Sequence, residues 1–195
     1  MNLVYGVGVN DADYAVTQCV KGKTVRCQAY RAWSGMLERC YSAKLHERRK
    51  TYAGVTVCAE WRSFMSFRSW WAENGVKGWQ LDKDLLTDSR EYSPESCIYI
   101  PAWLNSFTID CAARRGDLPV GVSLEARNVN KYKARCRHPS GVSEYLGNYS
   151  LPIEAHNAWI NRKLGIADEL KGEMDKINPR IYQRVIQLIE RKRHC

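Results

Sequence analysis

Bulky apolar residues recur at helical spacing in two regions near the start of the chain. Residues 27–42 and 59–73 each place an apolar side chain every three or four positions, which predicts two amphipathic helices. Asn74-Gly75 follows the second region, and glycine often ends a helix because it tolerates the left-handed conformation. We expect the two helices to pack together and to support the segment that follows, Trp79 to Asn105.

Apolar and polar residues alternate from Pro119 onward, which predicts strands. The clearest strand is KYKARCR, residues 131–137, where the cations fall on one face and the other side chains on the opposite face. Strands at PVGVSLEA and SEYLGNY, and a helix from Leu151-Pro152 to about Leu170, complete a three-stranded antiparallel sheet backed by one helix. The free face of that sheet would be cationic.

Three regions are expected in an α+β fold. The polar, turn-prone run Arg114 to Asp117 marks a joint. We therefore place a first domain at residues 1–115, with N-terminal helices packed on a strand–strand–helix core at 79–110. A second domain covers residues 116–172, and residues 173–195 form a basic amphipathic helix. That helix docks on the body by default, and the alternatives are pairing with a second copy or following a DNA backbone.

The charge balance indicates a polyanionic partner. The 195-residue chain has 30 Lys and Arg against 21 Asp and Glu, a formal net charge of +9, which favours nucleic acid first and an anionic membrane surface second. No run of about 18 apolar residues is present, so no spanning helix is expected, and the N-terminus lacks the features of a signal peptide. No acidic residue separates the four cations of strand 131–137, which favours a nucleic-acid contact over an ordinary solvated face.

Oxygen ligands for a metal ion lie near both ends of the segment 79–105. A predicted strand ends at Asp82 and Lys83, a second strand follows at 97–100, and a helix then carries Asn105. Phosphodiester hydrolysis needs a cation and a base, and Mg²⁺ prefers oxygen ligands such as those of Asp82 and Asn105. Lys83 occupies the place beside the metal carboxylate where a base is expected. It would serve as a base if it were desolvated, and otherwise it would hold a phosphate.

Residues 79–105 resemble the HNH (ββα-metal) nucleases, especially those encoded by bacteriophages. The matching motifs are Leu81-Asp82-Lys83, Ser93-Pro94-Glu95-Ser96-Cys97 and Asn105. The resemblance implies a metal-dependent DNA endonuclease, cutting or nicking, that binds Mg²⁺ or another divalent cation through Asp82 and Asn105 in the host cytoplasm. Lys83 stands where the family has its general-base His, and Ser96 where it has its middle Asn. The alternatives are a non-catalytic DNA-binding or regulatory protein on the same fold, or a protein that acts on a host protein.

Residues 119–170 resemble the ethylene-response-factor (APETALA-type) DNA-binding domain, a module that accompanies HNH nucleases in phage proteins. The matching residues are Pro119-Val120-Gly121-Val122, Tyr132-Lys133-Ala134-Arg135, Leu146-Gly147-Asn148-Tyr149, Glu154-Ala155-His156 and Ala158-Trp159. The resemblance implies that the sheet enters the major groove of double-stranded DNA. The DNA-binding candidates are Arg127, Lys131, Lys133, Arg135 and Arg137, with Glu144 and Tyr145 flanking them.

The eight cysteines leave two interpretations open. None of them forms a C-x-x-C pair, so the strongest zinc signature is missing. Without a secretory route, disulfides are not expected. A structural zinc ion held by Cys27, Cys40, Cys58 and Cys97 is one interpretation, and reduced thiols in the core are the other.

Overall fold

The computed structural model describes residues 3–109, 117–125, 129 and 131–194. Helices and small separate sheets share the chain, so the expected α+β class is confirmed. The chain divides into two compact units, Met1–Ile100 and Pro101–Cys195. This division falls earlier than the expected joint near residue 115. Within the described residues, no helix has the length and apolar character needed to cross a membrane.

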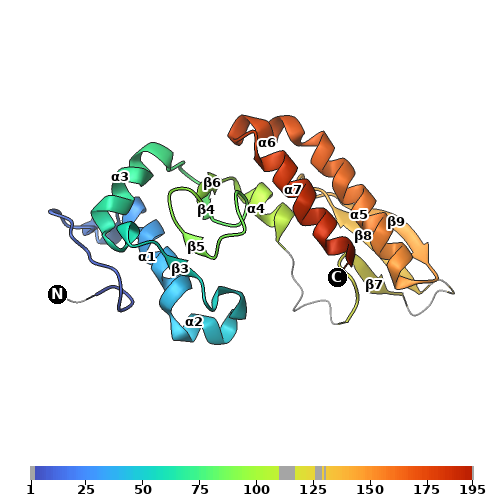
Figure 1. Ribbon diagram of the computed structural model, residues 1–195, viewed down its shortest axis with the longest axis horizontal. Helices are drawn as coiled ribbons and strands as arrows, with labels where there is room; N and C mark the ends of the chain where they lie inside the picture. The colour runs from blue at the N-terminus through green and yellow to red at the C-terminus, as the bar shows by residue number, and fades with distance from the viewer. Residues whose placement is uncertain (1–2, 110–116, 126–128, 130, 195) are drawn as a thin grey trace. The chain divides into compact units, whose positions relative to one another are not determined.

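The first unit combines three helices with three two-stranded pairings (Figure 1). Strands β1 and β2 pair antiparallel, β3 and β5 parallel, and β4 and β6 antiparallel. The strands are β1 (Thr17–Val20), β2 (Lys23–Arg26), β3 (Thr56–Val57), β4 (Gln80–Asp82), β5 (Glu91–Tyr92) and β6 (Ile98–Ile100). The helices are α1 (Gln28–Tyr41), α2 (Ala43–Arg48) and α3 (Phe64–Asn74), with short 3-10 turns η1 (Lys50–Tyr52) and η2 (Glu60–Arg62).

Aromatic side chains fill the core of the first unit. Trp33 of α1, Trp61 of η2 and Phe64 of α3 are fully buried, and the Trp33 indole N–H donates to the Trp61 carbonyl oxygen at 2.7 Å. Trp61 and Phe67 meet edge to face with their ring centroids 5.1 Å apart, a favourable aromatic geometry. The apolar stripes of the two predicted helices are therefore core, as expected.

Helix α3 begins later than the predicted start at residue 59. Ser63 has an extended backbone and its hydroxyl accepts from the Ser66 N–H at 3.1 Å, so it caps the helix. Asp11 also accepts from the Ser63 hydroxyl at 2.7 Å and from the Met65 N–H at 2.9 Å. These bonds satisfy the free amides at the helix start, and they join the N-terminal segment to α3.

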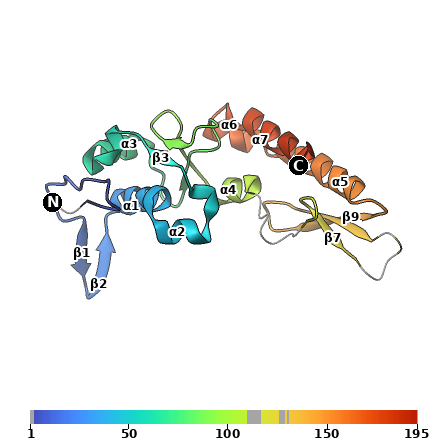
Figure 2. The same cartoon turned by 60° about the horizontal axis from the view of Figure 1, so that its bottom comes forward.

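The second unit is a three-stranded antiparallel sheet covered by helices (Figures 1 and 2). The strand order is β7-β8-β9, and α5 packs on all three strands. The elements are α4 (Ala102–Thr108), β7 (Val122–Leu124), β8 (Tyr132–Arg137), β9 (Ser143–Tyr149), α5 (Pro152–Glu169), α6 (Lys171–Ile177), α7 (Ile181–Glu190) and the 3-10 turn η4 (Arg191–His194).

Small residues allow α5 to lie close to this sheet. Ala134 of β8 and Ala155 of α5 are fully buried in the same cluster. Gly121, just before β7, has φ +83°, and a Cβ there would come within 2.1 Å of the Trp159 ring. Only glycine combines that backbone conformation with that close approach.

Helix α7 packs on the second unit through an apolar stripe. Ile181, Val185 and Ile189 are buried, and α7 contacts both α4 and α5. The Lys192 ammonium of η4 donates to the Thr108 carbonyl oxygen of α4 at 3.2 Å. The expected docking of this helix is confirmed, and residues 173–194 belong to the same compact unit as the sheet.

Candidate nucleic-acid interface and candidate metal residues

The side chains of β8 alternate between the helix-covered face of the sheet and the open face. Ala134 and Cys136 are buried, whereas Arg135 and Arg137 are exposed. Lys131 lies just before the strand and is exposed. The period of two therefore separates core from solvent as the sequence predicted, and it leaves the arginines on the open face (the sheet surface opposite α5).

A bulge in β9 brings an aromatic ring beside Arg135. The pairing shifts between Ala134 and Arg135, so that Ala134 pairs with Gly147 and Arg135 with Tyr145. Residues opposite each other in an antiparallel pair share a face. Tyr145 is 56% exposed, so Arg135 and Tyr145 form an exposed neighbouring pair on the open face.

Lys133 has an acidic partner that the sequence of its own strand does not reveal. Its ammonium is ion-paired with the Glu125 carboxylate, at the end of β7. The Glu125 N–H donates to the Lys131 carbonyl oxygen at 2.6 Å, which continues the β7–β8 ladder to this carboxylate. The hydrogen bond from Lys133 and its charge lower the pKa of Glu125 below its ordinary value. The cationic row is thus interrupted by an acid from the neighbouring strand, and Arg135 and Arg137 are its exposed members on β8.

Of two other interface candidates, one differs from expectation and the other lies outside the described residues. Glu144 pairs with Cys136 on the helix-covered side, and its carboxylate accepts from the Arg162 guanidinium of α5 at 2.8 Å. This bond lowers the pKa of Glu144. Glu144 therefore holds α5 to the sheet and does not flank the open face. Arg127 lies outside the described residues.

Asp82 closes the turn after β4. Its Oδ1 atom accepts from the Asp84 N–H at 2.9 Å and from the Leu85 N–H at 2.8 Å. Burial raises the pKa of this carboxyl group, and the two backbone bonds only partly oppose that effect. The carboxylate thus has a structural role in the chain reversal that follows β4.

Lys83 is 7% exposed, and its ammonium donates to the Asp84 carboxylate. It also lies 5.9 Å from the centre of the Tyr92 ring, whose hydroxyl accepts from Arg39 Nε at 2.9 Å. The Arg39 guanidinium is 5.4 Å from the same ring centre. The Lys83 nitrogen is thus held between the Asp84 carboxylate and the Tyr92 ring.

Ser96 fastens the loop between β5 and β6. Its hydroxyl donates to the Glu91 carbonyl oxygen at 2.6 Å and accepts from the Ser93 N–H at 3.0 Å. The residue is 2% exposed, so these polar groups satisfy each other away from water. Ser96 therefore positions the loop that leads into β6.

The expected metal ligands belong to different units. Asp82 ends β4 in the first unit, and Asn105 lies on α4 in the second. Their pairing as ligands remains a prediction. Within the described residues, no three His, Cys, Asp or Glu side chains gather as a metal site.

The four cysteines considered for zinc are not brought together either. Cys40 and Cys97 are buried free thiols, and burial raises the pKa of each to about 12. Burial also raises the pKa of Cys58, while the Cys27 sulfur lies 3.8 Å from the Tyr14 hydroxyl. A high thiol pKa disfavours the thiolate that zinc binds.

No protein-family model, curated protein or solved structure matches the chain. The class of the protein thus rests on its own features: an α+β chain with a basic, partly aromatic sheet face in the second unit.

The β1–β2 hairpin at residues 17–26 is absent from the elements that the sequence predicted. The available signal was the turn-prone Lys21-Gly22 pair between two short runs that each contain threonine and valine. Both residues adopt positive φ, 50° and 72°, as a two-residue hairpin turn of type I′ requires.

Proposed function

We propose that the protein binds double-stranded DNA through the open face of β7–β9. The observation that carries this proposal is the exposed group of Arg135, Arg137 and Tyr145 on the side of the sheet that α5 leaves uncovered. Arginine presents several donors in a planar fork, which suits both phosphates and guanine edges. A tyrosine ring adds contact area with little loss of side-chain entropy.

The charge distribution supports the same partner. Residues 101–195 hold 16 Lys and Arg against 10 Asp and Glu, whereas residues 1–100 hold 14 against 11. The larger excess thus belongs to the unit that contains the sheet. Contacts from such cations to phosphates release bound counterions, so they favour binding most at low salt.

A finer assignment of the fold follows from chain order. We propose that β4, the 83–97 loop, β6 and α4 correspond to the ββα element of HNH nucleases, and that β7–β9 with α5 correspond to the ethylene-response-factor-type module. The support is the antiparallel pairing of Asp82 with Ile98, followed by a helix that begins at Ala102. On this assignment, Asp82 and Asn105 would be the ligands of Mg²⁺ or another divalent cation.

Cleavage is the second candidate function, and that chain order favours it. The ion pair between Lys83 and Asp84 counts against cleavage. In HNH nucleases this position holds the histidine that acts as general base, whereas here it holds a lysine that is bonded to Asp84. DNA binding without cleavage agrees with both observations. We therefore give binding as the conclusion and cleavage as the hypothesis to be tested beside it.

Binding is tested by fluorescence anisotropy with a labelled random-sequence duplex over a range of salt concentrations. The double variant Arg135→Gln/Arg137→Gln should bind about 10- to 100-fold more weakly near 100 mM salt. The slope of log affinity against log salt should fall by about 2, since each phosphate contact contributes about 0.9. The control Lys77→Gln/Lys176→Gln removes the same charge at exposed positions elsewhere. Equal losses in the two double variants would contradict the sheet as the DNA surface.

Cleavage is tested by plasmid nicking with Mg²⁺ or Mn²⁺. Asp82→Asn is the useful variant, because an amide oxygen can still accept from the Asp84 and Leu85 N–H groups while the negative charge is lost. If the metal assignment is right, nicking disappears in Asp82→Asn and in Asn105→Ala. Nicking that persists in both variants excludes this assignment. No nicking by the wild type, together with salt-sensitive DNA binding, establishes the non-catalytic alternative.

A further inference from the structure

The β1–β2 hairpin is a two-stranded ribbon that the first unit leaves uncovered. All eight strand residues are exposed, and no other strand among the described residues pairs with either edge. Figure 2 shows the ribbon extending away from α1. An isolated two-stranded hairpin gains little stability from burial in water. A surface of this kind is typical of a segment whose stabilising contacts come from a partner.

The base of the ribbon is nevertheless fixed to the core. The Cys27 N–H donates to the Val16 carbonyl oxygen at 2.8 Å, one step beyond the Thr17–Arg26 pair. Val16 and Cys27 pack against the buried aromatic cluster of the first unit. The type I′ turn at Lys21-Gly22 fixes the other end. The ribbon is therefore held in one register at both ends while its middle stays exposed.

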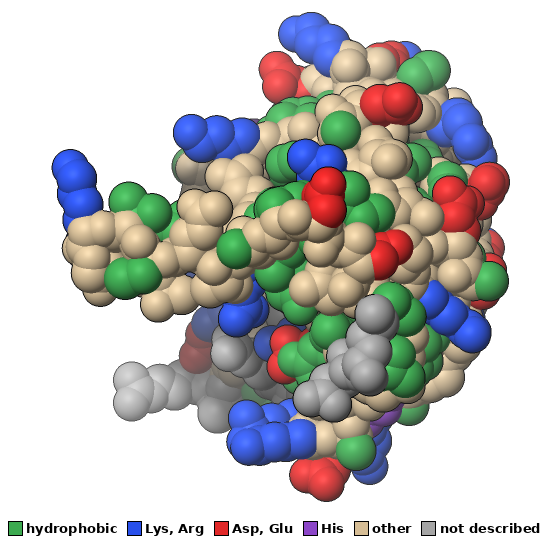
Figure 3. All heavy atoms as spheres, turned by 90° about the vertical axis from the view of Figure 1, so that its left-hand side faces the viewer, with side chains coloured by type: hydrophobic (Ala, Val, Ile, Leu, Met, Phe, Trp, Pro, Cys, Tyr) green, Lys and Arg blue, Asp and Glu red, His purple; other side chains and the backbone are tan. Residues whose placement is uncertain are grey.

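The charge on the ribbon has one sign. Lys21, Lys23 and Arg26 are exposed, and the sequence contains no acidic residue between Asp13 and Glu38. Figure 3 shows an arm with Lys and Arg side chains and apolar side chains, and with no Asp or Glu on it. Repulsion between these cations opposes pairing of the ribbon with a second copy of the chain. The positive charge of the ribbon favours a polyanion as its partner.

The two faces of the ribbon differ in chemistry. The register places Gln18, Val20, Lys23 and Val25 on one face, with Val20 48% and Val25 52% exposed. Thr17, Cys19, Thr24 and Arg26 lie on the other face. The first face thus offers an amide, an ammonium and two apolar side chains, which are the groups that contact base edges and thymine methyl groups.

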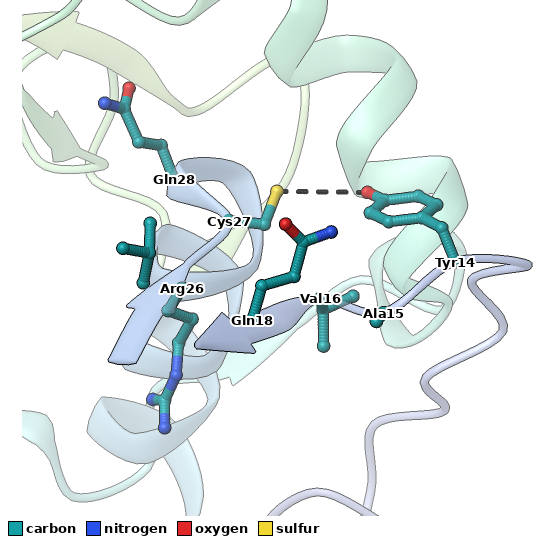
Figure 4. A pocket seen from close by; sticks show the side chains of 8 residues that line it. Tyr14, Ala15, Val16, Gln18, Arg26, Cys27 and Gln28 are labelled. Atoms are coloured by element: carbon teal, nitrogen blue, oxygen red, sulfur yellow. Dashed lines mark hydrogen bonds between the residues drawn. The ribbon is translucent and has the colours of Figure 1, made fainter. Parts of the chain in front are cut away.

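A hollow lies at the base of the ribbon. It has a volume of about 310 Å³, and Tyr14, Gln18, Val25 and Cys27 are among its lining residues (Figure 4). The Arg68 guanidinium lies 5.2 Å from the centre of the Tyr14 ring. The Gln18–Val25 pair therefore continues into a concave surface that has a cation beside it.

We propose that the β1–β2 ribbon is a second DNA contact, which enters a groove of the duplex with the Gln18–Val25 face toward the bases and with Lys21 and Arg26 toward the phosphates. Four residues at about 3.4 Å each extend roughly 14 Å, which exceeds the major-groove depth of about 8.5 Å. The major groove, about 12 Å wide, admits a two-stranded ribbon. The inference rests on the proposed DNA-binding function and adds a contact on the first unit.

The first test removes the ribbon charges in the full-length protein. The triple variant Lys21→Ala/Lys23→Ala/Arg26→Ala should bind a labelled duplex about 10- to 30-fold more weakly near 100 mM salt, with a salt slope lower by about 2 to 3. The matched control is Lys77→Ala/Lys176→Ala/Arg180→Ala, which removes the same net charge at other exposed positions. The control should lose less than about 3-fold, because distant charges are screened beyond about 10 Å. Equal losses in the two triple variants overturn the proposal.

The second test reads contact directly through a thiol on the Gln18–Val25 face, introduced as Val25→Cys at a position that is 52% exposed. Its alkylation by N-ethylmaleimide is followed by peptide mass spectrometry, with the partly buried Cys58 as internal reference. Saturating duplex should slow alkylation at position 25 at least 5-fold and leave Cys58 unchanged. An unchanged rate at position 25 while anisotropy reports bound DNA overturns the ribbon contact alone. Absence of any DNA binding removes both proposals, and protection of position 25 that grows with protein concentration without DNA establishes a contact between copies instead.

Discussion

Lys163 provides a direct test of how burial sets stability in the second unit. This lysine of α5 is 7% exposed, and its ammonium lies 3.6 Å from the centre of the Phe107 ring and 5.7 Å from that of Trp159. Burial, together with a smaller effect of the nearby Lys192 charge, lowers its pKa from 10.5 to about 8. The charged form is therefore disfavoured in the folded protein.

The sign of the pH dependence follows from proton binding. Below pH 8 both the folded and the unfolded states hold the proton. Between pH 8 and 10.5 the unfolded state holds more protons than the folded state, so the free energy of unfolding rises with pH. At about 1.4 kcal/mol per pH unit, the rise through this window is about 3 kcal/mol.

Lys163→Met removes this cost at neutral pH and keeps a long apolar side chain. The variant also loses the contact between the ammonium and the aromatic rings, which contributes about 2 kcal/mol when it is desolvated. We therefore expect Lys163→Met to be about 1 to 3 kcal/mol more stable than the wild type at pH 7. That advantage should disappear as the pH rises through 10.5.

Urea denaturation at pH 7, 9 and 10.5 measures the effect as a difference between variants, which cancels titrations common to both proteins. Lys176→Met is the control, because Lys176 is exposed on α6 and its replacement should give no difference that changes with pH. A stability difference for Lys163→Met that stays constant from pH 7 to 10.5 would refute the reasoning.

Three further substitutions test individual contacts by thermal or urea unfolding. Gly121→Ala should destabilise by more than about 2 kcal/mol, because its Cβ would lie 2.1 Å from the Trp159 ring at φ +83°; Gly141→Ala, at φ +98° with open space, should cost less. Ser96→Ala should cost about 0.5 to 1.5 kcal/mol, because it removes the bonds of the buried Ser96 hydroxyl to the Ser93 N–H and the Glu91 carbonyl oxygen; a loss under about 0.5 kcal/mol would contradict its role in the loop. His156→Phe should cost about 1 to 3 kcal/mol, since the ring nitrogens lie 2.9 Å from the Val120 oxygen and 2.8 Å from the Lys192 oxygen. An unchanged melting temperature would argue against His156 as the link between η4 and the sheet.

Elements with a buried face were predictable from the sequence. Helix α1 and strand β8 both lie within a residue or two of their expected positions, because each alternates buried and exposed side chains at its own period. The β1–β2 ribbon buries neither face, so no such pattern marks it. Its evidence lies in the turn, where Lys21 adopts a conformation that is uncommon for a residue with a side chain.

The unit boundary depended on contacts that composition does not reveal. Residues 114–117 have a turn-prone composition, yet α4 belongs with the second unit. Phe107 lies under the Lys163 ammonium, and Thr108 accepts from Lys192, 84 positions further along the chain. A helix of seven residues is assigned to a unit by such distant partners and not by its own sequence.

The charged residues of a strand can be interpreted only together with those of the neighbouring strands. The run Lys131 to Arg137 shows four cations at period two, but Glu125, just after the neighbouring strand β7, forms an ion pair with Lys133. The candidate interface is therefore smaller than the sequence suggested, and it is centred on Arg135, Arg137 and Tyr145. That centre depends on the β9 bulge, which sequence alone did not predict.

The segment from Trp79 to Ile100 keeps its form through contacts that are independent of catalysis. Asp82 closes the turn after β4, Ser96 closes the loop before β6, and the Lys83 ammonium is fixed by Asp84 beside the Tyr92 ring. Each of these polar groups is bonded within the segment. Lys83 therefore fits the hairpin through its contacts with Asp84 and Tyr92. The proposed DNA surface on β7–β9 lies in another part of the chain, so binding and cleavage have to be measured independently.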